Sequence, residues 1–367
     1  MQLWRMNMSN YYIGVMSGTS LDGIDIALCE ITDSTCKLLA FEEYNFEHGL
    51  KEEILEIIGG MTTLKEIGAL DVKLGLAYAF NIKRFMREKK LKIEDINAIG
   101  LHGQTLWHEP DGDFPFSMQL GSASVVSAQT GMRVVNDFRN MDIANGGQGA
   151  PFAPAFHQFL FNSLGQNIGV LNLGGIANLS VLGDKLLGYD IGPANILMDI
   201  WMSKTQQKSY DKDGEFARSG KIDESLLNSM IQDDYFKKSA PKSTGREYFN
   251  ESWLASLLPI FNTMRDEDIQ RTLLELTATT IANEAKKHHL RTLILCGGGA
   301  KNNFLVERLT ALMQAEVKQS NTYGVSSDAM EAMAFAWLAK KRVKSEVVEL
   351  SSVTGAKQNS LLGGIYG

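Results

Sequence analysis

The feature that most constrains the fold is a turn of small polar residues between two strand-like apolar runs near the N-terminus. The runs are YYIGVM and IDIALCEI, and the turn between them contains Gly18, Asp22 and Gly23. The apolar, β-branched character of both runs predicts two buried strands. Glycines in such a turn allow backbone N–H groups to approach an anion such as a phosphate. An ordinary hairpin at Asp22-Gly23 explains the same residues without a ligand.

Two further glycine turns follow strand-like runs later in the chain. One lies in LNLGGIANLS, where Asn172, Gly174 and Gly175 separate two apolar runs. The other is the glycine run at 297–299, between the apolar LILC and a helix-like segment. Neither the Walker A pattern nor GxGxxG is present, so P-loop and dinucleotide-binding interpretations lose their main support. Three small-residue turns at the ends of buried strands nevertheless favour a bound ligand.

The order of the predicted elements indicates an α/β protein with two related halves. The run IGV at 13–15 leads into the first turn, and IGV at 168–170 leads into the second. A length of 367 residues suits about two domains. Apolar spacing predicts long helices at 64–90 and 266–289. The stretch 140–160 is rich in glycine and proline, and we expect a loop or hinge there.

Composition and charge limit the classes of partner. A hydrophobic content of 44% and a net charge of -7 fit a globular protein and give no support for nucleic acid or an anionic membrane surface as partners. No apolar run approaches the roughly 20 residues of a membrane span. The N-terminal MQLWRMNMSN lacks the apolar core of a secretory signal. Three cysteines match no metal spacing and argue against a disulfide framework. We therefore expect a cytoplasmic protein.

Several polar residues at the ends of predicted strands are candidates for ligand contacts. Asp190 in GYDIGPAN either caps the next helix or projects into a cleft as a general base. His102, Gln104, Thr105 and Arg139 suit a polar ligand such as a sugar. A hydrogen bond within a loop explains each of these four equally well.

Three further carboxylates, Asp22, Asp25 and Glu331, have open roles, and a fourth is Asp199. Asp22 and Asp25, beside the first turn, are candidate Mg²⁺ ligands, because hard cations prefer oxygen. Glu331 lies on an otherwise apolar helix face, and its spacing leaves open whether it faces solvent or a cleft. Asp199, on the helix expected after Asp190, is read as a surface or packing residue.

Motifs along nearly the whole chain resemble those of the anhydro-N-acetylmuramic acid kinases, a family of the sugar kinase/Hsp70/actin superfamily. In order, they are IGVMSGTSLDGID, GLHGQTLWH, ANGGQGAPFAPAFH, LNLGGIANLS, GYDIGPAN, PKSTGREYFN, CGGGAKN and DAMEAMAFA. So many motifs in one order argue against chance similarity. One segment departs from the pattern: LGSASVVS has Ser122 where the family usually has Asp or Asn followed by Pro. No contact by Ser122 is therefore carried over.

The resemblance implies a two-domain, actin-like (ribonuclease H-like) ATPase fold, in which a duplicated mixed sheet with flanking helices surrounds an interdomain cleft. The expected N-terminal domain covers 1–138 and is joined by the tail 350–367. The expected C-terminal domain covers 139–349. A homodimer is expected from the resemblance alone.

The resemblance also implies ATP and Mg²⁺ as cofactors and assigns the site residues. Asp190 carries over as the catalytic base. The implied ATP contacts are Gly18, Thr19, Ser20, Leu21, Asp22, Gly23, Ile24, Asp25, Asn172, Gly174, Gly175, Gly297, Gly298 and Gly299. The implied sugar contacts are His102, Gln104, Thr105, Arg139, Asn195 and Glu331. The implied metal ligands are Asp22, Asp190 and Glu331.

The implied reaction, a step of peptidoglycan recycling, combines hydrolysis with phosphorylation. Asp190 takes a proton from water, the water opens the 1,6-anhydro bridge at the anomeric carbon, and the departing O6 attacks the γ-phosphate of ATP. The product is N-acetylmuramic acid 6-phosphate. Because O6 of the anhydro sugar is an ether without a proton, the base acts on water instead.

Two alternatives stay open at this point. One is a kinase of the same family for another anhydro sugar such as levoglucosan. Cations for the lactyl carboxylate would distinguish the two substrates, and the candidates are Lys242, Arg246 and Arg139. The other is a nucleotide-dependent binding protein of the superfamily without phosphorylation, for which the sequence shows no peptide-binding appendage.

Overall fold

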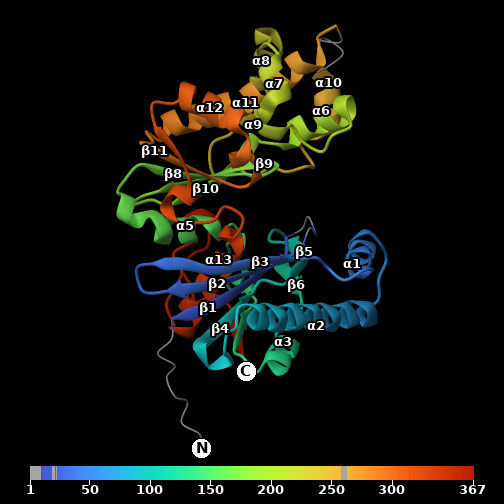
Figure 1. Ribbon diagram of the computed structural model, residues 1–367, viewed down its shortest axis with the longest axis vertical. Coiled ribbons are helices and arrows are strands. Elements are labelled where there is room, and N and C mark those ends of the chain that lie inside the picture. The colour runs from blue at the N-terminus through green and yellow to red at the C-terminus, as the bar shows by residue number, and fades with distance from the viewer. Residues whose placement is uncertain (1–9, 19–20, 22, 258–262) are drawn as a thin grey trace, which may run out of the picture. The chain divides into compact units, whose positions relative to one another are not determined.

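The chain forms two compact units, each built on its own β-sheet (Figure 1). The computed structural model describes residues 10–18, 21, 23–257 and 263–367. The first unit comprises Met1–Leu160 and Ala329–Gly367, and the second comprises Phe161–Asp328.

The first unit contains a six-stranded mixed sheet with the order β13-β7-β4-β1-β2-β3. β1 to β3 form antiparallel pairs, whereas β4 runs parallel to β1 and β7 runs parallel to β4. The strands are β1 (Tyr11–Met16), β2 (Ile24–Ile31), β3 (Cys36–Tyr44), β4 (Ile96–Leu101), β7 (Val134–Asn136) and β13 (Gly364–Tyr366). A separate hairpin contains β5 (Gln104–Glu109) and β6 (Phe116–Leu120). β1 and β2 are the two apolar runs predicted as strands from the sequence.

Helices cover both faces of this sheet. They are α1 (Leu50–Gly59), α2 (Leu64–Glu88), η1 (Ile93–Asp95), α3 (Ala123–Thr130), α4 (Asn140–Ala144), α5 (Ala153–Phe161), α13 (Met330–Val343) and α14 (Ser351–Thr354). Ile13 and Val15 of β1 pack in one core with Tyr78 of α2. Gly14 faces the opposite side, where an added Cβ would lie 1.7 Å from the carbonyl oxygen of Ala332 in α13. This close approach of a helix to a strand requires glycine.

The first unit is larger than the expected N-terminal domain, which was 1–138 joined by the tail 350–367. It also contains residues up to Leu160 and residues from Ala329 onward. The stretch 140–160, expected as a loop or hinge, is a loop only at 145–152, between α4 and α5, which form the rest of it. α13, expected in the second domain, packs against β1, β2 and β4. The boundary differs from the expectation because this packing joins segments that are distant in the sequence.

The second unit repeats the same sheet plan in five strands. The strand order is β10-β9-β8-β11-β12. Numbered along the chain, these are the third, second, first, fourth and fifth strands of the unit. The strands β3-β2-β1-β4-β7 of the first sheet follow the same order. The first three strands are again antiparallel, and the last two again run parallel to the first. The strands are β8 (Ile168–Leu173), β9 (Ile176–Leu182), β10 (Leu187–Pro193), β11 (Thr292–Cys296) and β12 (Glu316–Gln319). This repetition agrees with the expected α/β fold with a duplicated mixed sheet.

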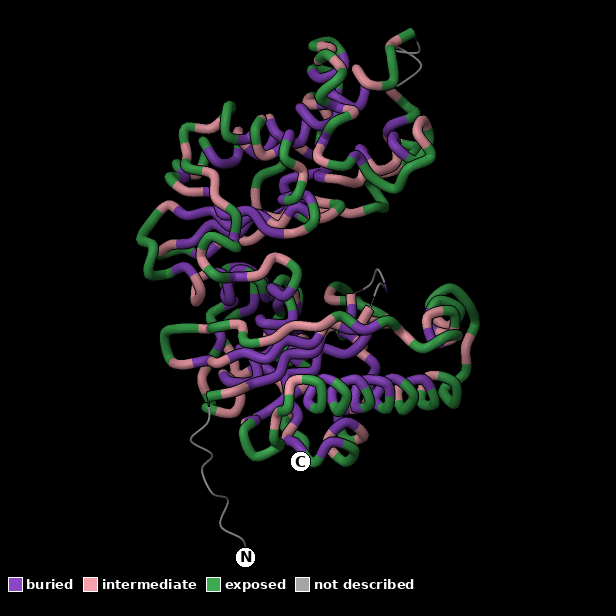
Figure 2. Tube along the Cα trace, viewed as in Figure 1, coloured by how far each residue is buried: buried purple, intermediate pink, exposed green. Residues whose placement is uncertain are grey.

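The long helix α11 crosses the core of the second unit. Its buried Leu273, Leu276 and Ile281 pack with Leu171 of β8, and Figure 2 shows the buried residues gathered along the strands and inner helix faces. The helices are η2 (Asn162–Leu164), α6 (Ile196–Gln206), η3 (Lys212–Gly214), α7 (Glu215–Ser219), α8 (Glu224–Ile231), α9 (Asp234–Lys237), α10 (Glu251–Leu257), α11 (Asp266–Lys287), η5 (Gly298–Lys301), α12 (Asn303–Leu312) and η6 (Ser320–Tyr323). Among the described residues of either unit, every helix is too short or too polar to span a membrane.

Candidate active site

Asp190 lies in the middle of β10, not at the strand end expected from the sequence, and three hydrogen-bond donors hold its carboxylate. The side-chain amide of Asn178, on the neighbouring β9, donates to Oδ1. The hydroxyl of Ser243 and the backbone N–H of Thr244 donate to Oδ2 at 3.0 and 2.9 Å. The carboxylate is therefore oriented by a strand and by the polar loop around residue 243. Asp190 does not cap the following helix, which was one of its two possible roles, because α6 begins at Ile196 with Asn195 as its N-cap.

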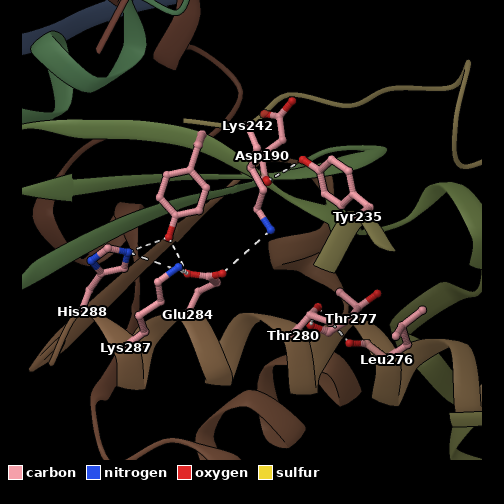
Figure 3. Close-up of polar contacts among 10 residues, drawn as sticks. Asp190, Tyr235, Lys242, Leu276, Thr277, Thr280, Glu284, Lys287 and His288 are labelled. Atoms are coloured by element: carbon pink, nitrogen blue, oxygen red, sulfur yellow. Dashed lines mark hydrogen bonds and ion pairs between the residues drawn. The ribbon is translucent and has the colours of Figure 1, made fainter. Parts of the chain in front are cut away.

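The backbone of Asp190 is fixed as firmly as its side chain. Its N–H donates to the carbonyl oxygen of Lys242 at 3.1 Å, and its own carbonyl oxygen accepts from the Tyr235 hydroxyl at 2.8 Å. Figure 3 shows Asp190 and Lys242 side by side, with the Tyr235 hydroxyl directed at the Asp190 backbone. The side chain of Lys242 is only 3% exposed and lies near Glu284. Lys242 is therefore not placed to bind a substrate carboxylate, and that expectation is wrong.

The second and third glycine turns open onto adjoining pockets in the second unit. One pocket, of about 620 Å³, is lined by Gly174, Gly175 and Arg246 among others. The other, of about 470 Å³, is lined by Gly299 and by residues of the 209–213 loop. Gly298, Asn195 and Asp199 line both. Volumes of this size suit a small-molecule ligand. Two of the three turns predicted to bind ATP thus share one concave region.

Packing at Gly297 explains why this turn is built from glycine. Gly297 has φ +80°, and an added Cβ would lie 2.2 Å from Oδ1 of Asn172. The predicted ATP residues Asn172 and Gly297 therefore lie directly against each other. Gly298 differs, because no heavy atom lies within 4 Å of an added Cβ. Its open side faces the pockets that it lines.

Asp199 is a pocket residue that the sequence interpretation missed. Burial raises its pKa to about 6, Arg246 opposes that shift, and Asp211 adds to it. Asn195 and Asp199 are one helical turn apart, and the N–H of Asp199 donates to the carbonyl of Asn195 at 2.8 Å. Residues four apart share a helix face. This spacing after the Gly-Pro turn is the signal that could have identified Asp199.

In the first unit, the predicted sugar residues His102 and Arg139 are in direct contact. The guanidinium of Arg139 donates to Nε2 of His102 at 3.0 Å and to the carbonyl oxygen of Gly149 at 2.8 Å. Burial and then the charge of Arg139 lower the pKa of His102 to about 3, so the ring is neutral at pH 7. Burial also lowers the pKa of Arg139 to about 10, and the charge of Glu331 opposes that shift. Glu331 is exposed by surface area at the start of α13, yet desolvation by the surrounding protein raises the pKa of its carboxyl, and the charge of Arg139 opposes that shift.

Gln104 joins this group to the first glycine turn. Its side-chain amide donates to the carbonyl oxygen of Gly18 at 3.3 Å. Its side-chain oxygen is buried without a hydrogen-bond partner among the described residues. An unpaired buried acceptor is unfavourable unless a ligand or water donates to it. Thr105 instead accepts from Gln119 of β6 at 3.3 Å.

The first turn is described only in part. Thr19, Ser20 and Asp22 lie outside the described residues. Leu21 has φ +56°, and its N–H donates to the carbonyl oxygen of Gly18 at 3.2 Å. The side chains of Leu21 and Ile24 are buried in the core of the first unit, which leaves only their backbone for a nucleotide. Gly23 immediately precedes β2, and the half-buried Asp25 is the second residue of that strand.

Comparison with known proteins gives consistent matches over the full chain. A family model described as anhydro-N-acetylmuramic acid kinase matches residues 10–367. The chain is 53% identical over 367 residues to a protein of that name from Sulfurimonas denitrificans, covering 98% of this chain and 100% of the relative. It is 47% identical over 363 residues to one from Pasteurella multocida, covering 97% and 96%. Among solved structures, the chain is similar to component A of (R)-2-hydroxyglutaryl-CoA dehydratase from Acidaminococcus fermentans, at 12% identity and a TM-score of 0.48, covering 92% and 100%.

Proposed function

The chain belongs to the anhydro-N-acetylmuramic acid kinase family, and from that premise we propose how its residues carry out the reaction. It is a kinase that opens 1,6-anhydro-N-acetylmuramic acid and phosphorylates O6 to give N-acetylmuramic acid 6-phosphate in peptidoglycan recycling. The identity of about half the residues over nearly the full length does not favour a levoglucosan kinase or a non-catalytic binding protein.

Asp190 is the proposed general base, and the arrangement of its hydrogen-bond donors carries this assignment. A carboxylate offers about four lone-pair positions on its two oxygens. Among the described residues, Ser243 and Thr244 occupy Oδ2, and Asn178 occupies one position on Oδ1. One position on Oδ1 is left to accept a proton from water. The three donors also fix the direction of that lone pair, as proton transfer in a transition state requires.

The proposed reaction begins with proton transfer from water to Asp190. Water gives its proton to Oδ1 of Asp190 and attacks the anomeric carbon, and the bond from that carbon to O6 breaks. O6 leaves with the electron pair and attacks the γ-phosphorus of ATP, which releases ADP. The sugar hydroxyl is thus generated as a nucleophile without a base acting on it directly. Positioning and neutralisation of the phosphoryl oxygens are the protein's remaining tasks.

The two adjoining pockets of the second unit support binding of ATP. Gly174 and Gly175 offer backbone N–H groups near Arg246, which suits phosphate oxygens. Gly298, Gly299 and the 209–213 loop then receive the adenosine. Asn195, expected at the sugar, lines both pockets beside the glycines, and we assign it to the nucleotide instead. The first turn, from Gly18 to Asp25, stays assigned to the phosphates.

The residues present fit a Mg²⁺ ion bound mainly through water and phosphate. The described residues contain no group of three or more metal-ligating side chains. Mg²⁺ at phosphates commonly uses only one or two carboxylates and retains several waters. Of the predicted ligands, Asp190 has most of its lone pairs occupied, and Asp22 lies outside the described residues. Glu331 is exposed at the start of α13, but desolvation by the surrounding protein raises the pKa of its carboxyl and disfavours the ionised form that binds a metal, while the charge of Arg139 opposes that shift. Bound Mg²⁺ would neutralise charge on the transferring phosphoryl group.

His102, Gln104, Thr105, Arg139 and Glu331 form the proposed sugar side of the site. The neutral His102 and the unpaired oxygen of Gln104 suit sugar hydroxyl and amide groups. Arg139 is the proposed cation for the lactyl carboxylate, since Lys242 is buried elsewhere. We also expect the enzyme to act as a homodimer in the cytoplasm, where ATP is available.

An ATP-consumption assay tests the proposal directly. We expect turnover with 1,6-anhydro-N-acetylmuramic acid, much less with levoglucosan, and none with free N-acetylmuramic acid. The variant Asp190→Asn should bind ATP normally in a titration but show no turnover, because the amide cannot accept the proton. Phosphorylation of the free sugar alone would refute the ring-opening mechanism, and turnover by Asp190→Asn would remove Asp190 from its role.

A further inference from the structure

Lys242 is a buried cation beside the proposed catalytic base. Its side chain is 3% exposed, and Nζ lies 3.9 Å from Oε1 of Glu284. The same Nζ lies 4.8 Å from the centre of the Tyr235 ring, a cation–π contact. Figure 3 shows the side chain directed toward Glu284, on α11, and away from the Asp190 carboxylate. Burial lowers the pKa of Lys242, and the charge of Glu284 opposes that shift.

Glu284 is itself fixed to two elements of the second unit. Its Oε2 accepts a hydrogen bond from the hydroxyl of Tyr189 at 2.7 Å and one from Nζ of Lys287 at 3.2 Å. Tyr189 is on β10, immediately before Asp190, and its hydroxyl also contacts Nε2 of His288 at 2.7 Å. Glu284 is therefore a rigid partner that connects α11 to the strand bearing the base.

The segment that begins at Lys242 carries two of the three donors to the Asp190 carboxylate, the Ser243 hydroxyl and the Thr244 N–H. The carbonyl of Lys242 accepts the Asp190 N–H, and the next two residues, Ser243 and Thr244, donate to Oδ2. Ser243 is exposed and Thr244 is only half-buried. The Oγ1 of Thr244 is buried but has no hydrogen-bond partner among the described residues, so Lys242 is the one of the three whose side chain anchors the segment through polar contacts in the interior.

We propose that Lys242 is a positioning residue for the Asp190 carboxylate, acting through the Ser243 and Thr244 donors that its buried side chain holds in place. The inference rests on the proposed role of Asp190 as the base. Lys242 does not touch substrate in this arrangement. Its contribution is geometric: the ion pair with Glu284 and the contact with Tyr235 set where the loop meets the carboxylate.

The main test is Lys242→Met, with Lys238→Met as the matched control. Lys238 also lies over the Tyr235 ring, with Nζ 5.5 Å from its centre, but it is exposed and belongs to no Asp190 contact. Displacement of a catalytic group by about 1 Å lowers the rate by about 100-fold. We expect kcat of Lys242→Met to fall by about that factor, with the KM values for ATP and sugar nearly unchanged. Lys238→Met should retain the wild-type kcat.

A second pair of variants separates positioning from stability. Lys242→Met leaves Glu284 without its buried cation, so the double variant Lys242→Met/Glu284→Gln, which removes both charges, is prepared alongside it and checked by circular dichroism. It should fold and keep the low kcat. Ser243→Ala should also lower kcat, and adding it to Lys242→Met should cause less further loss than it does alone, because both changes act on the same donors.

The outcomes distinguish this inference from the proposed function. Turnover by Asp190→Asn would overturn both. An inactive Asp190→Asn together with a wild-type kcat for folded Lys242→Met would overturn the positioning role alone. A raised KM for the sugar at unchanged kcat would also overturn it, because Lys242 would then be a substrate contact. A lower melting temperature without loss of kcat would reduce Lys242 to a structural residue.

Discussion

Adjacent glycines in the third turn give a sharp test of the nucleotide pocket, because the structure predicts opposite results for Gly298→Ala and Gly297→Ala. Gly298 lines both pockets, and an added methyl group would meet no protein atom within 4 Å. The fold should therefore tolerate alanine, with stability unchanged or raised by about 0.5 kcal/mol through the less flexible unfolded chain. The methyl group would instead occupy space needed by the ligand.

The expected magnitude for Gly298→Ala comes from overpacking a close contact. Such clashes cost about 1–3 kcal/mol. If the nucleotide bears that cost, its affinity falls by about 5- to 150-fold. The KM for ATP should rise within that range in steady-state kinetics, while the melting temperature does not fall below the wild-type value. A wild-type KM for ATP would refute the assignment of this pocket to the nucleotide.

Gly297→Ala should affect stability instead. Its φ of +80° strains any residue with a Cβ, and that Cβ would lie 2.2 Å from Asn172 Oδ1 and 2.9 Å from the Leu173 backbone. With ψ 171° as well, this backbone conformation is essentially restricted to glycine and costs other residues about 1–3 kcal/mol, and the clash adds about 1–3 kcal/mol. At about 2–4 °C per kcal/mol for a unit of this size, the melting temperature should fall by roughly 10 °C. An unchanged melting temperature would show that the turn does not have the described geometry.

Two further predictions concern stability alone. Asp199→Asn should raise the melting temperature near pH 7 and have little effect near pH 4. Because the pKa of Asp199 is about 6 in the folded state and 3.8 in the unfolded state, the folded state keeps a proton that the unfolded state has released between these two pH values. Stability therefore falls as the pH rises from about 3.8 to about 6. Thermal melts at pH 4 and pH 7 measure the effect of Asp199→Asn, and an equal effect at both pH values would contradict the prediction. Gly14→Ala should destabilise the first unit by more than about 3 kcal/mol, since its Cβ would lie 1.7 Å from the Ala332 carbonyl oxygen. Denaturant unfolding measures this, and wild-type stability would show that α13 does not pack on β1 as described.

Local patterns in the sequence were sufficient for the elements and for part of the site. Apolar runs predicted β1, β2, β8 and β11, and periodic spacing predicted α2 and α11, because side-chain alternation depends only on near neighbours. The glycine turns were also identified this way, and so was Asp190, although it lies in the middle of β10 and not at the strand end that the sequence predicted. The order of motifs then gave the family, which the comparisons confirmed.

Packing between distant segments decided what the sequence interpretation missed. Lys242 looks like any polar loop cation, yet contacts with Tyr235 and Glu284 bury it. Asp199 has the sequence pattern of a surface helix residue, yet its position on α6 places it in the lining of two pockets that Gly298 also lines.

By itself, the sequence determined the α/β class, the repeated strand-turn-strand plan and the identity of the candidate base, all of which depend on residues close together in the chain. Only the tertiary structure decided that α13 completes the first unit and which donors hold Asp190. These contacts join residues separated by tens to hundreds of positions, such as Asp190 with Thr244 and Gly14 with Ala332. A local pattern carries no record of such a partner, because burial and hydrogen bonding are properties of the packed chain.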